Sequence, residues 1–167
     1  MDALIFSDSH GRTRAMYAAR DRQISPPDAV FFLGDGLRDT ELLAYEAKAF
    51  YAVRGNCDWF SSYDDTPNER IVSFAGLRIL MTHGHAYNVK SGLGALLIRA
   101  TAVDADLVLF GHTHEPICEC IPAGTVIGGK ELPRRMHLFN PGSVGMEGSF
   151  GTLTVRGGEL LLSHGSL

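Results

Sequence analysis

The chain has 167 residues, of which 45 % are hydrophobic and 20 % are charged, and its formal net charge at pH 7 is −4. This length predicts a single domain over residues 1–167 that buries about two-thirds of the surface exposed by the unfolded chain. Because no run of Lys and Arg is longer than Arg134-Arg135, the sequence argues against a surface that tracks a nucleic-acid polymer.

The first half of the chain alternates short apolar runs, which predict strands, with segments whose apolar residues recur at helical spacing. In chain order we expect strand Ala3–Phe6, helix Arg12–Gln23, strand Ala29–Leu33, helix Thr40–Phe50, strand Tyr51–Arg54, a hairpin of Arg70–Phe74 and Leu77–Met81, helix Gly92–Val103 and strand Leu107–Phe110. The β-α-β-α-β order at the start favours parallel strands with helices packed outside.

The second half contains short predicted strands joined by glycine-rich turns. These strands are Ile117–Ile121, Thr125–Gly128, Met136–Phe139, Ser149–Val155 and Glu159–Ser163. Because Arg156-Gly157-Gly158 is typical of a hairpin turn, we expect this half to be antiparallel. Two β-rich halves with helices outside indicate two sheets packed face to face and covered by helices.

Five of the predicted strands end in an Asp, His or Asn flanked by glycine. These residues are Asp8 and His10 in SDSHG, Asp35 in LGDG, Asn56 in GNCD, His83 and His85 in HGH, and His112 and His114 in GHTH. Ligands of α/β sheets lie beyond the carboxyl ends of strands, so we expect these side chains to converge. A simple turn explains any one block, but five blocks of oxygen and nitrogen donors in the same position predict a metal centre.

The ordered set DSH, GD, GNCD, HGH and GHTH resembles the calcineurin-like metallophosphoesterase superfamily, and in particular its small single-domain phosphodiesterases of bacteria and archaea. The resemblance extends from the first strand to Asn140-Pro141-Gly142-Ser143. It implies an α/β fold, a four-layer α/β/β/α sandwich of two mixed sheets flanked by helices. It also implies that one metal is bound by Asp8, His10, Asp35 and His114, and a second by Asp35, Asn56, His83 and His112, with Asp35 bridging.

Two divalent ions about 3.5–4 Å apart suit in-line attack on phosphorus, and a water held between them loses a proton near neutral pH. We therefore expect hydrolysis by a metal-bridging hydroxide, without a Ser or Cys nucleophile. The expected catalytic residues are His85, Asp35 and Asn56, of which Asn56 is a neutral ligand that preserves positive charge. Mixed N and O ligands without a thiolate are compatible with Mn, Fe, Co, Ni or Zn, and of these Mn is the expected ion.

Cys57 departs from the wider superfamily, in which a histidine follows this asparagine and is proposed to protonate the leaving group. A thiol matches that role poorly, so we interpret Cys57 as a small buried filler. His85 is either the replacement acid or a phosphate donor, or else it is structural. Asp58 either orients a histidine such as His10 or caps the turn.

Several other residues keep two interpretations. Arg12 and Arg54 lie next to the ligand blocks and either contact substrate phosphate or form surface salt bridges. The bridge from Pro122 to Arg135 is longer than is usual in the small phosphodiesterases, and it is either a hairpin at a subunit contact or a lid. His137 and His164 are interpreted as ordinary strand residues.

The compartment and partners follow from what the sequence lacks. The first residues, MDALIFSDSHG, lack the positively charged region and the long apolar region that form a signal peptide. No apolar run approaches the length of a membrane span. The three cysteines are odd in number, and Cys118 and Cys120 are too close along one strand to bridge. We therefore expect a reducing cytoplasm and no membrane. The resemblance implies a small phosphodiester as substrate, and a homo-oligomer is left open.

Three functions are weighed on this basis. The first is a metal-dependent phosphodiesterase that acts on small phosphodiesters. The second is a phosphomonoesterase or cyclic-nucleotide hydrolase with the same centre. The third, of a different class, is a non-catalytic metal-binding scaffold of the same fold, as in the retromer subunit that resembles these enzymes. The presence of every expected ligand favours the hydrolases.

Overall fold

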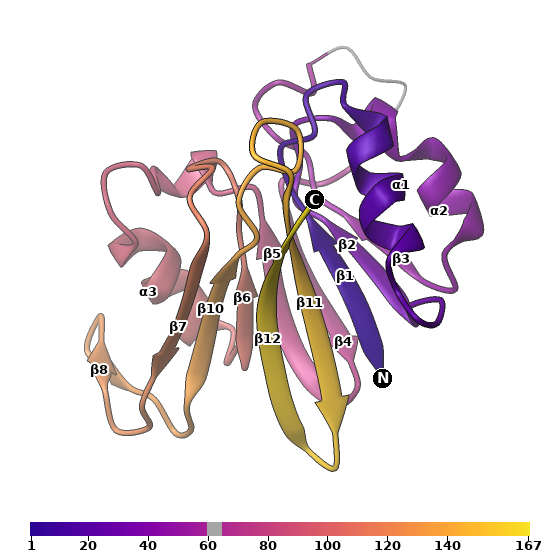
Figure 1. The fold of residues 1–167 in the computed structure, drawn as a ribbon. Coiled ribbons are helices and arrows are strands. Elements are labelled where there is room, and N and C mark those ends of the chain that lie inside the picture. Colours follow the sequence, from indigo (N-terminus) through magenta and orange to yellow (C-terminus); the bar gives the residue numbers. More distant parts are fainter. Residues whose placement is uncertain (60–64) are drawn as a thin grey trace.

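The computed structural model describes residues 1–59 and 65–167 as two β-sheets with helices outside (Figure 1). The strands are β1 (Asp2–Phe6), β2 (Ala29–Phe32), β3 (Phe50–Ala52), β4 (Glu69–Phe74), β5 (Leu77–Thr82), β6 (Leu107–Leu109), β7 (Ile117–Ile121), β8 (Val126–Ile127), β9 (Lys130–Glu131), β10 (Met136–Asn140), β11 (Ser149–Arg156) and β12 (Glu159–Ser166). The helices are α1 (Thr13–Asp21), α2 (Glu41–Glu46) and α3 (Gly94–Ala102), with 3-10 turns η1 (Leu37–Thr40) and η2 (His85–Tyr87).

Each main sheet has five strands of mixed direction. The first has the order β12-β11-β1-β2-β3, and the second has the order β4-β5-β6-β10-β7. In the first sheet β1, β2 and β3 are parallel, with Phe6 paired to Phe32 and Phe32 to Ala52. In the second sheet β5 and β6 are parallel, and α3 lies between them in the chain. The carboxyl ends of the parallel strands therefore lie at one edge of each sheet.

Alternate residues of the central strands face different layers, because successive side chains of a strand point to opposite faces. Ile5, Phe31 and Leu109 belong to the core between the two sheets. Leu4, Phe6, Phe32, Met16 and Leu43 form a second core under α1 and α2. Leu80, Val108, Phe110, Leu96 and Ala100 form a third under α3. The predicted four-layer α/β/β/α sandwich is confirmed.

The predicted helix Thr40–Phe50 is wrong at both ends. A 3-10 turn occupies Leu37–Thr40, and α2 covers only Glu41–Glu46 before Ala47 becomes extended. The helix ends early because Phe50 already pairs with Val30 as the first residue of β3. No helix among the described residues has the length and apolar character needed to cross a membrane.

The sequence predicted an antiparallel second half of the chain, and this prediction is only partly right. The pairs β7–β10 and β11–β12 are antiparallel, but β10 runs parallel to β6, with Phe139 paired to Leu109. The chain between β6 and β10 makes an excursion through β7, β8 and β9, so β10 returns in the direction of β6. This return brings Asn140 beside the loop that follows β6.

The bridge from Pro122 to Arg135 forms the two-stranded ribbon β8–β9, which packs against α3. The Lys130 ammonium donates to the carbonyl oxygen of Thr101 at 3.0 Å and pairs with Asp104 at 2.8 Å. These partners belong to the end of α3 and the turn before β6, opposite the carboxyl ends of the strands. The ribbon is therefore not a lid over those ends, and a role at a subunit contact stays a prediction.

Candidate metal centre

The polar residues predicted to converge follow five different strands at the carboxyl edge of the sandwich. The loop after β1 carries Asp8 and His10, the loop after β2 carries Asp35, and the loop after β3 carries Asn56. From the second sheet, His83 follows β5, and His112 and His114 follow β6. The strands end in the apolar core, and Asp8, Asp35 and His83 are themselves buried at its edge.

A first group of donors is formed by Asp8, His10 and His114, whose ligand atoms all lie within 4.8 Å of one another. Oδ1 of Asp8 lies 3.1 Å from Nε2 of His114 and 3.7 Å from Nε2 of His10. This Oδ1 is buried and accepts no hydrogen bond from any described residue. An unpaired buried carboxylate oxygen is costly, so its position beside two imidazole nitrogens fits a bound cation.

A second group contains Asp35, His83 and His112, again with ligand atoms within 4.8 Å. Nε2 of His83 lies 3.4 Å from Oδ2 of Asp35 and 3.2 Å from Nδ1 of His112. Nδ1 of His83 donates to the carbonyl oxygen of Leu33 at 2.7 Å. That hydrogen bond fixes the imidazole ring and leaves Nε2 as the nitrogen available to a metal.

Asp35 and Asn56 complete the arrangement. Asp35 also lies within 4.8 Å of His10 and Cys57, measured between ligand atoms, so its carboxylate is close to donors of both groups. Oδ1 of Asn56 is buried and has no hydrogen-bond partner in the described part of the chain, while Nδ2 faces Sγ of Cys57 at 3.3 Å. A free carbonyl oxygen of this kind is a suitable neutral metal ligand.

The backbone is strained at the same residues. Among the described residues, eight that are not glycine have a positive φ, and five of them are predicted ligands: Asp8 (56°), His10 (45°), Asp35 (59°), His112 (68°) and His114 (64°). The left-handed conformation costs roughly 1–2 kcal/mol per residue, and such strain gathers at functional sites. The glycine of GNCD is required for a related reason, since a Cβ on Gly55 would lie 2.1 Å from Oδ1 of Asp35.

The charged groups of the second donor group shift the pKa values of one another. Burial would raise the pKa of Asp35, but hydrogen bonding and charge interaction with His83 outweigh it and hold that pKa well below its usual value. Burial would lower the pKa of His83, but the carboxylates of Asp35 and Asp8 raise it. Burial and the charge of His83 lower the pKa of His112 to about 4. Protonation of His83 is thus favoured where its ring faces the two carboxylates.

His85 lies beside the second group without being part of a ligand group. Its ring centroid is 5.5 Å from that of His83 and 6.2 Å from that of His112. Its Nδ1 is buried and has no hydrogen-bond partner among the described residues. Burial and the charge of His83 lower the pKa of His85, which favours a neutral imidazole that can donate one N–H.

The structure corrects the interpretation of Cys57 and decides between those of Asp58. Cys57 is exposed, so it is not a buried filler. Partial desolvation of its sulfur and the carboxylate of Asp35 raise the pKa of Cys57 to about 11, which keeps it a thiol. Asp58 caps the turn, because its carboxylate accepts backbone N–H groups of the loops after β2 and β3.

Sequence reasoning missed several residues that hold the loops in place. The Asn140 amide donates to the carbonyl oxygen of Gly111, in the loop that carries His112 and His114. The Ser143 hydroxyl donates to the carbonyl oxygen of Asp8 at 2.8 Å. Both lie in the NPGS segment, which could have indicated them. Asp39, in GDGLRD, accepts the Ser9 hydroxyl at 2.6 Å and the Gly11 N–H at 2.8 Å, and no motif indicated it.

A groove of about 420 Å³ opens beside the donors. Its lining includes His10, Asp35, Cys57 and one arginine, Arg38, which the sequence analysis did not single out. Neither Arg12 nor Arg54 lines it, and their contact with substrate phosphate stays a prediction. Arg38 gives this groove a cation beside three carboxylates, those of Asp35, Asp39 and Asp58.

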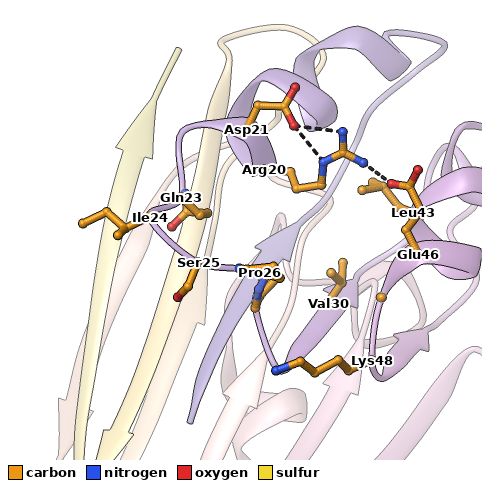
Figure 2. Close-up of a pocket in the computed structure, with 12 residues that line it drawn as sticks. Arg20, Asp21, Gln23, Ile24, Ser25, Pro26, Val30, Leu43, Glu46 and Lys48 are labelled. Carbon is orange, nitrogen blue, oxygen red and sulfur yellow. Dashed lines mark hydrogen bonds and ion pairs between the residues drawn. The ribbon is translucent and has the colours of Figure 1, made fainter.

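A second cavity, of about 430 Å³, lies between α1, α2 and β2, and contains none of the predicted ligands (Figure 2). Val30 and Leu43 contribute apolar surface, while Arg20 forms ion pairs with Asp21 and Glu46. The arginine is thereby tied to both helices. Among the described residues, none of the groups of potential metal ligands lies in this cavity.

Comparisons with known proteins agree with this geometry. Residues 1–158 match the calcineurin-like phosphoesterase superfamily domain. The chain is 33 % identical over 144 residues to the probable metallophosphoesterase YsnB of Bacillus subtilis (strain 168), a match that covers 86 % of this chain and 75 % of that protein.

Two solved structures share the fold. A single mutant of Vps29 from Entamoeba histolytica has a TM-score of 0.71 at 20 % identity, over 100 % of this chain and 99 % of that chain. An archaeal phosphodiesterase has a TM-score of 0.65 at 22 % identity, over 98 % of this chain and 99 % of that chain. At these identities the likeness concerns the fold alone.

Proposed function

The chain belongs to the calcineurin-like phosphoesterase superfamily, and we propose that it is a phosphodiesterase that hydrolyses small phosphodiesters at a two-metal centre. The observation that carries the proposal is the pair of donor groups, each built from loops of both sheets. The carboxylate of Asp35 lies close to donors of both groups. The buried, unpaired Oδ1 of Asp8 supports a cation at the first group. The similarity to a phosphodiesterase structure is consistent with a diester substrate.

In this proposal Asp8, His10, Asp35 and His114 hold one ion, and Asp35, Asn56, His83 and His112 hold the other. Bound divalent ions lower the pKa of water and stabilise the charge that develops on a phosphoryl oxygen. The carboxylate of Asp35 can serve both ions because it has two oxygens. The donor set contains nitrogen and oxygen but no required thiolate, which is compatible with Mn, Ni, Co, Fe or Zn, and Mn is the ion that we propose.

The protein residues around the ions have separate tasks. The hydrogen bond to Leu33 holds the ring of His83 so that Nε2 points at the site. We assign to His85 a hydrogen bond to a phosphate oxygen, since its ring lies beside those of His83 and His112 and its lowered pKa favours the neutral imidazole, which has one N–H to donate. Cys57 stays a thiol and is assigned no nucleophilic or acid role, because thiolate formation near neutral pH is opposed by its raised pKa.

Two alternatives use the same geometry. A phosphomonoesterase or cyclic-nucleotide hydrolase requires the same ions and differs in the groove that receives the rest of the substrate. A non-catalytic metal-binding scaffold is supported by the shared fold of Vps29. The strained backbone at five donors is consistent with a hydrolase, since strain of this kind gathers at active sites and ligand clamps.

The proposed setting is a reducing cytoplasm, which the three free cysteines support. The proposed partner is a small phosphodiester rather than a nucleic-acid polymer or a membrane, and a homo-oligomer stays open.

One screen separates these functions. The metal-depleted protein is supplied with Mn, Ni or Zn and assayed against matched p-nitrophenyl monoesters and diesters, 2′,3′- and 3′,5′-cyclic nucleotides, and single-stranded DNA. We expect the highest kcat/KM for an acyclic diester and none without metal. A preference for monoesters or cyclic nucleotides would select the second function. Turnover of no substrate, with metals shown to be bound, would select the scaffold.

A further inference from the structure

The carboxylate of Asp58 binds four backbone N–H groups from two different loops. Its Oδ2 accepts the N–H of Asp35 at 2.8 Å and the N–H of Gly55 at 2.9 Å. Its Oδ1 accepts the N–H of Gly36 at 2.9 Å and the N–H of Leu37 at 3.0 Å. The side chain is buried, with 7 % of its residue surface exposed. All four acceptor positions of the carboxylate are thus occupied by backbone.

This arrangement holds Asp35 in an unfavourable backbone conformation. Asp35 has a φ of 59° and Gly36 a φ of 140°, so three successive N–H groups turn toward one point. Successive N–H groups in such a turn form a concave anion site, and Asp58 is the anion that fills it. The side chain of Asp35 is left to face His83 and to accept the Cys57 N–H at 2.7 Å through Oδ1.

A second carboxylate extends the connection to the neighbouring strand. Asp39 follows Asp35 in the loop after β2, and it accepts the Gly11 N–H and the Ser9 hydroxyl from the loop after β1. Asp58 thus ties the third loop to the second, and Asp39 ties the second to the first. Neither carboxylate belongs to a group of potential ligands among the described residues. Each joins two loops that carry ligands on neighbouring strands.

We propose that Asp58 is a positioning residue that sets the carboxylate of Asp35 for cation binding by clamping the backbone of Asp35, Gly36 and Leu37 to that of Gly55. This inference rests on the proposed function, in which Asp35 serves both ions. It predicts that metal affinity depends on a carboxylate that does not contact the metal. Changes to partners of metal ligands typically cost 10- to 100-fold in affinity.

The test uses Asp58→Asn, in which the amide NH₂ replaces one acceptor oxygen and faces N–H groups that it cannot bind. We expect the Mn affinity, measured by isothermal titration, to fall at least about tenfold. In the metal-free protein we expect amide hydrogen exchange at Asp35, Gly36, Leu37 and Gly55 to become at least about tenfold faster, because a lost hydrogen bond lowers the cost of local opening.

A matched control is Asp28→Asn. Asp28 also accepts a backbone N–H, from Asp2 at 3.0 Å, but in the turn before β2, opposite the site. The Asp28→Asn variant should leave the Mn affinity and the exchange rates of the four amides unchanged, even where it lowers overall stability. If Asp58→Asn does not fold, Asp58→Ala with added formate provides the second measurement, since formate can occupy the vacated anion site and should restore Mn affinity.

The outcomes are distinguishable. An Asp58→Asn protein with wild-type Mn affinity, or with unchanged exchange at the four amides, overturns the inference. So does an Asp58→Ala protein whose Mn affinity formate leaves unrestored, where that is the variant that folds. If the wild type itself binds no Mn, Ni or Zn, the proposed function is wrong. The role of Asp58 in metal binding is then wrong as well.

Discussion

His83 and Asp35 face one another from different sheets, with Nε2 of His83 lying 3.4 Å from Oδ2 of Asp35. Asp35 follows β2 in the first sheet, and His83 follows β5 in the second. The candidate metal centre therefore exists only when the two sheets are packed together. A cation bound here would link the sheets, and any ion that binds only the folded state stabilises it.

The first prediction concerns metal content. The chain should bind two transition-metal ions, because two groups of donors meet at the carboxyl ends of five strands. Elemental analysis and titration after treatment with a chelator would give the stoichiometry, and Mn at 100 times the Kd of each site should raise the free energy of unfolding by about 2.7 kcal/mol for each ion bound. A stoichiometry below one under saturating Mn, Ni and Zn would contradict the assignment.

Asp35→Asn should abolish hydrolysis and weaken both metal sites. The amide keeps the size of the side chain but removes the negative charge that two cations would share. We expect turnover to fall by more than about 100-fold, comparable with the loss of a group that stabilises transition-state charge. Titration with Mn checks both sites. Loss at only one site would show that Asp35 does not bridge.

His85→Ala should retain both metal ions and lose rate. His85 is assigned a contact with phosphate rather than with metal, so turnover is expected to fall by about 100-fold while the stoichiometry of Mn stays at the wild-type value. Steady-state kinetics and metal analysis of the same preparation check this. If the variant loses its metal, His85 is itself a ligand.

The presence of Cys57 predicts that the rate of hydrolysis depends strongly on the leaving group. With a thiol in place of an imidazole, the wild type should hydrolyse p-nitrophenyl diesters far faster than alkyl diesters, by up to the ~10²–10⁴-fold that general acids contribute. Cys57→His should narrow the gap by raising alkyl-ester turnover more than aryl-ester turnover, once its metal content is shown to be intact. A flat dependence in the wild type, with chemistry rate-limiting, would mean that another proton donor is present.

Glu69 predicts part of the acid sensitivity of the fold. Glu69 on β4 is paired with Arg99 on α3, with Nε of Arg99 3.0 Å from Oε1, and Tyr87 also donates to this carboxylate. The hydrogen bonds from Arg99 outweigh burial and lower the pKa of Glu69 below its usual value. A carboxyl with a lowered folded-state pKa contributes stability above its unfolded value of about 4.3, and the contribution is lost as pH falls through the folded-state pKa.

Glu69→Gln should therefore lower the free energy of unfolding at pH 7 by about 1 kcal/mol, since solvent screens the partly exposed pair. Between pH 5 and the folded-state pKa the wild type should lose stability more steeply than the variant. Urea denaturation at several pH values, with Glu119→Gln at an exposed residue of β7 as the control, measures the difference. Parallel pH profiles for Glu69→Gln and the wild type would refute the role of Glu69.

Local sequence patterns were enough to predict the strands and the polar residues that follow them. Apolar runs such as Leu107–Leu109 define strands through their own composition, and Gly-His-Thr-His directly after that run places donors at the edge of the sheet without knowledge of its neighbours. The parallel order of β1, β2 and β3 also follows from short segments of the chain, because helical patterns separate them. These features depend on residues that are close in the sequence.

Strand pairing, burial and hydrogen bonding between residues distant in the sequence could be read only from the folded chain. The parallel pairing of β10 with β6 follows an excursion through β7–β9, and α2 ends early because Phe50 must pair with Val30. The exposure of Cys57 and the four hydrogen bonds of Asp58 depend on how the loops after β2 and β3 meet. A local pattern sets which face of a strand is apolar, but burial, pKa and hydrogen-bond partners are properties of the assembled environment, since they require groups from several loops at one point.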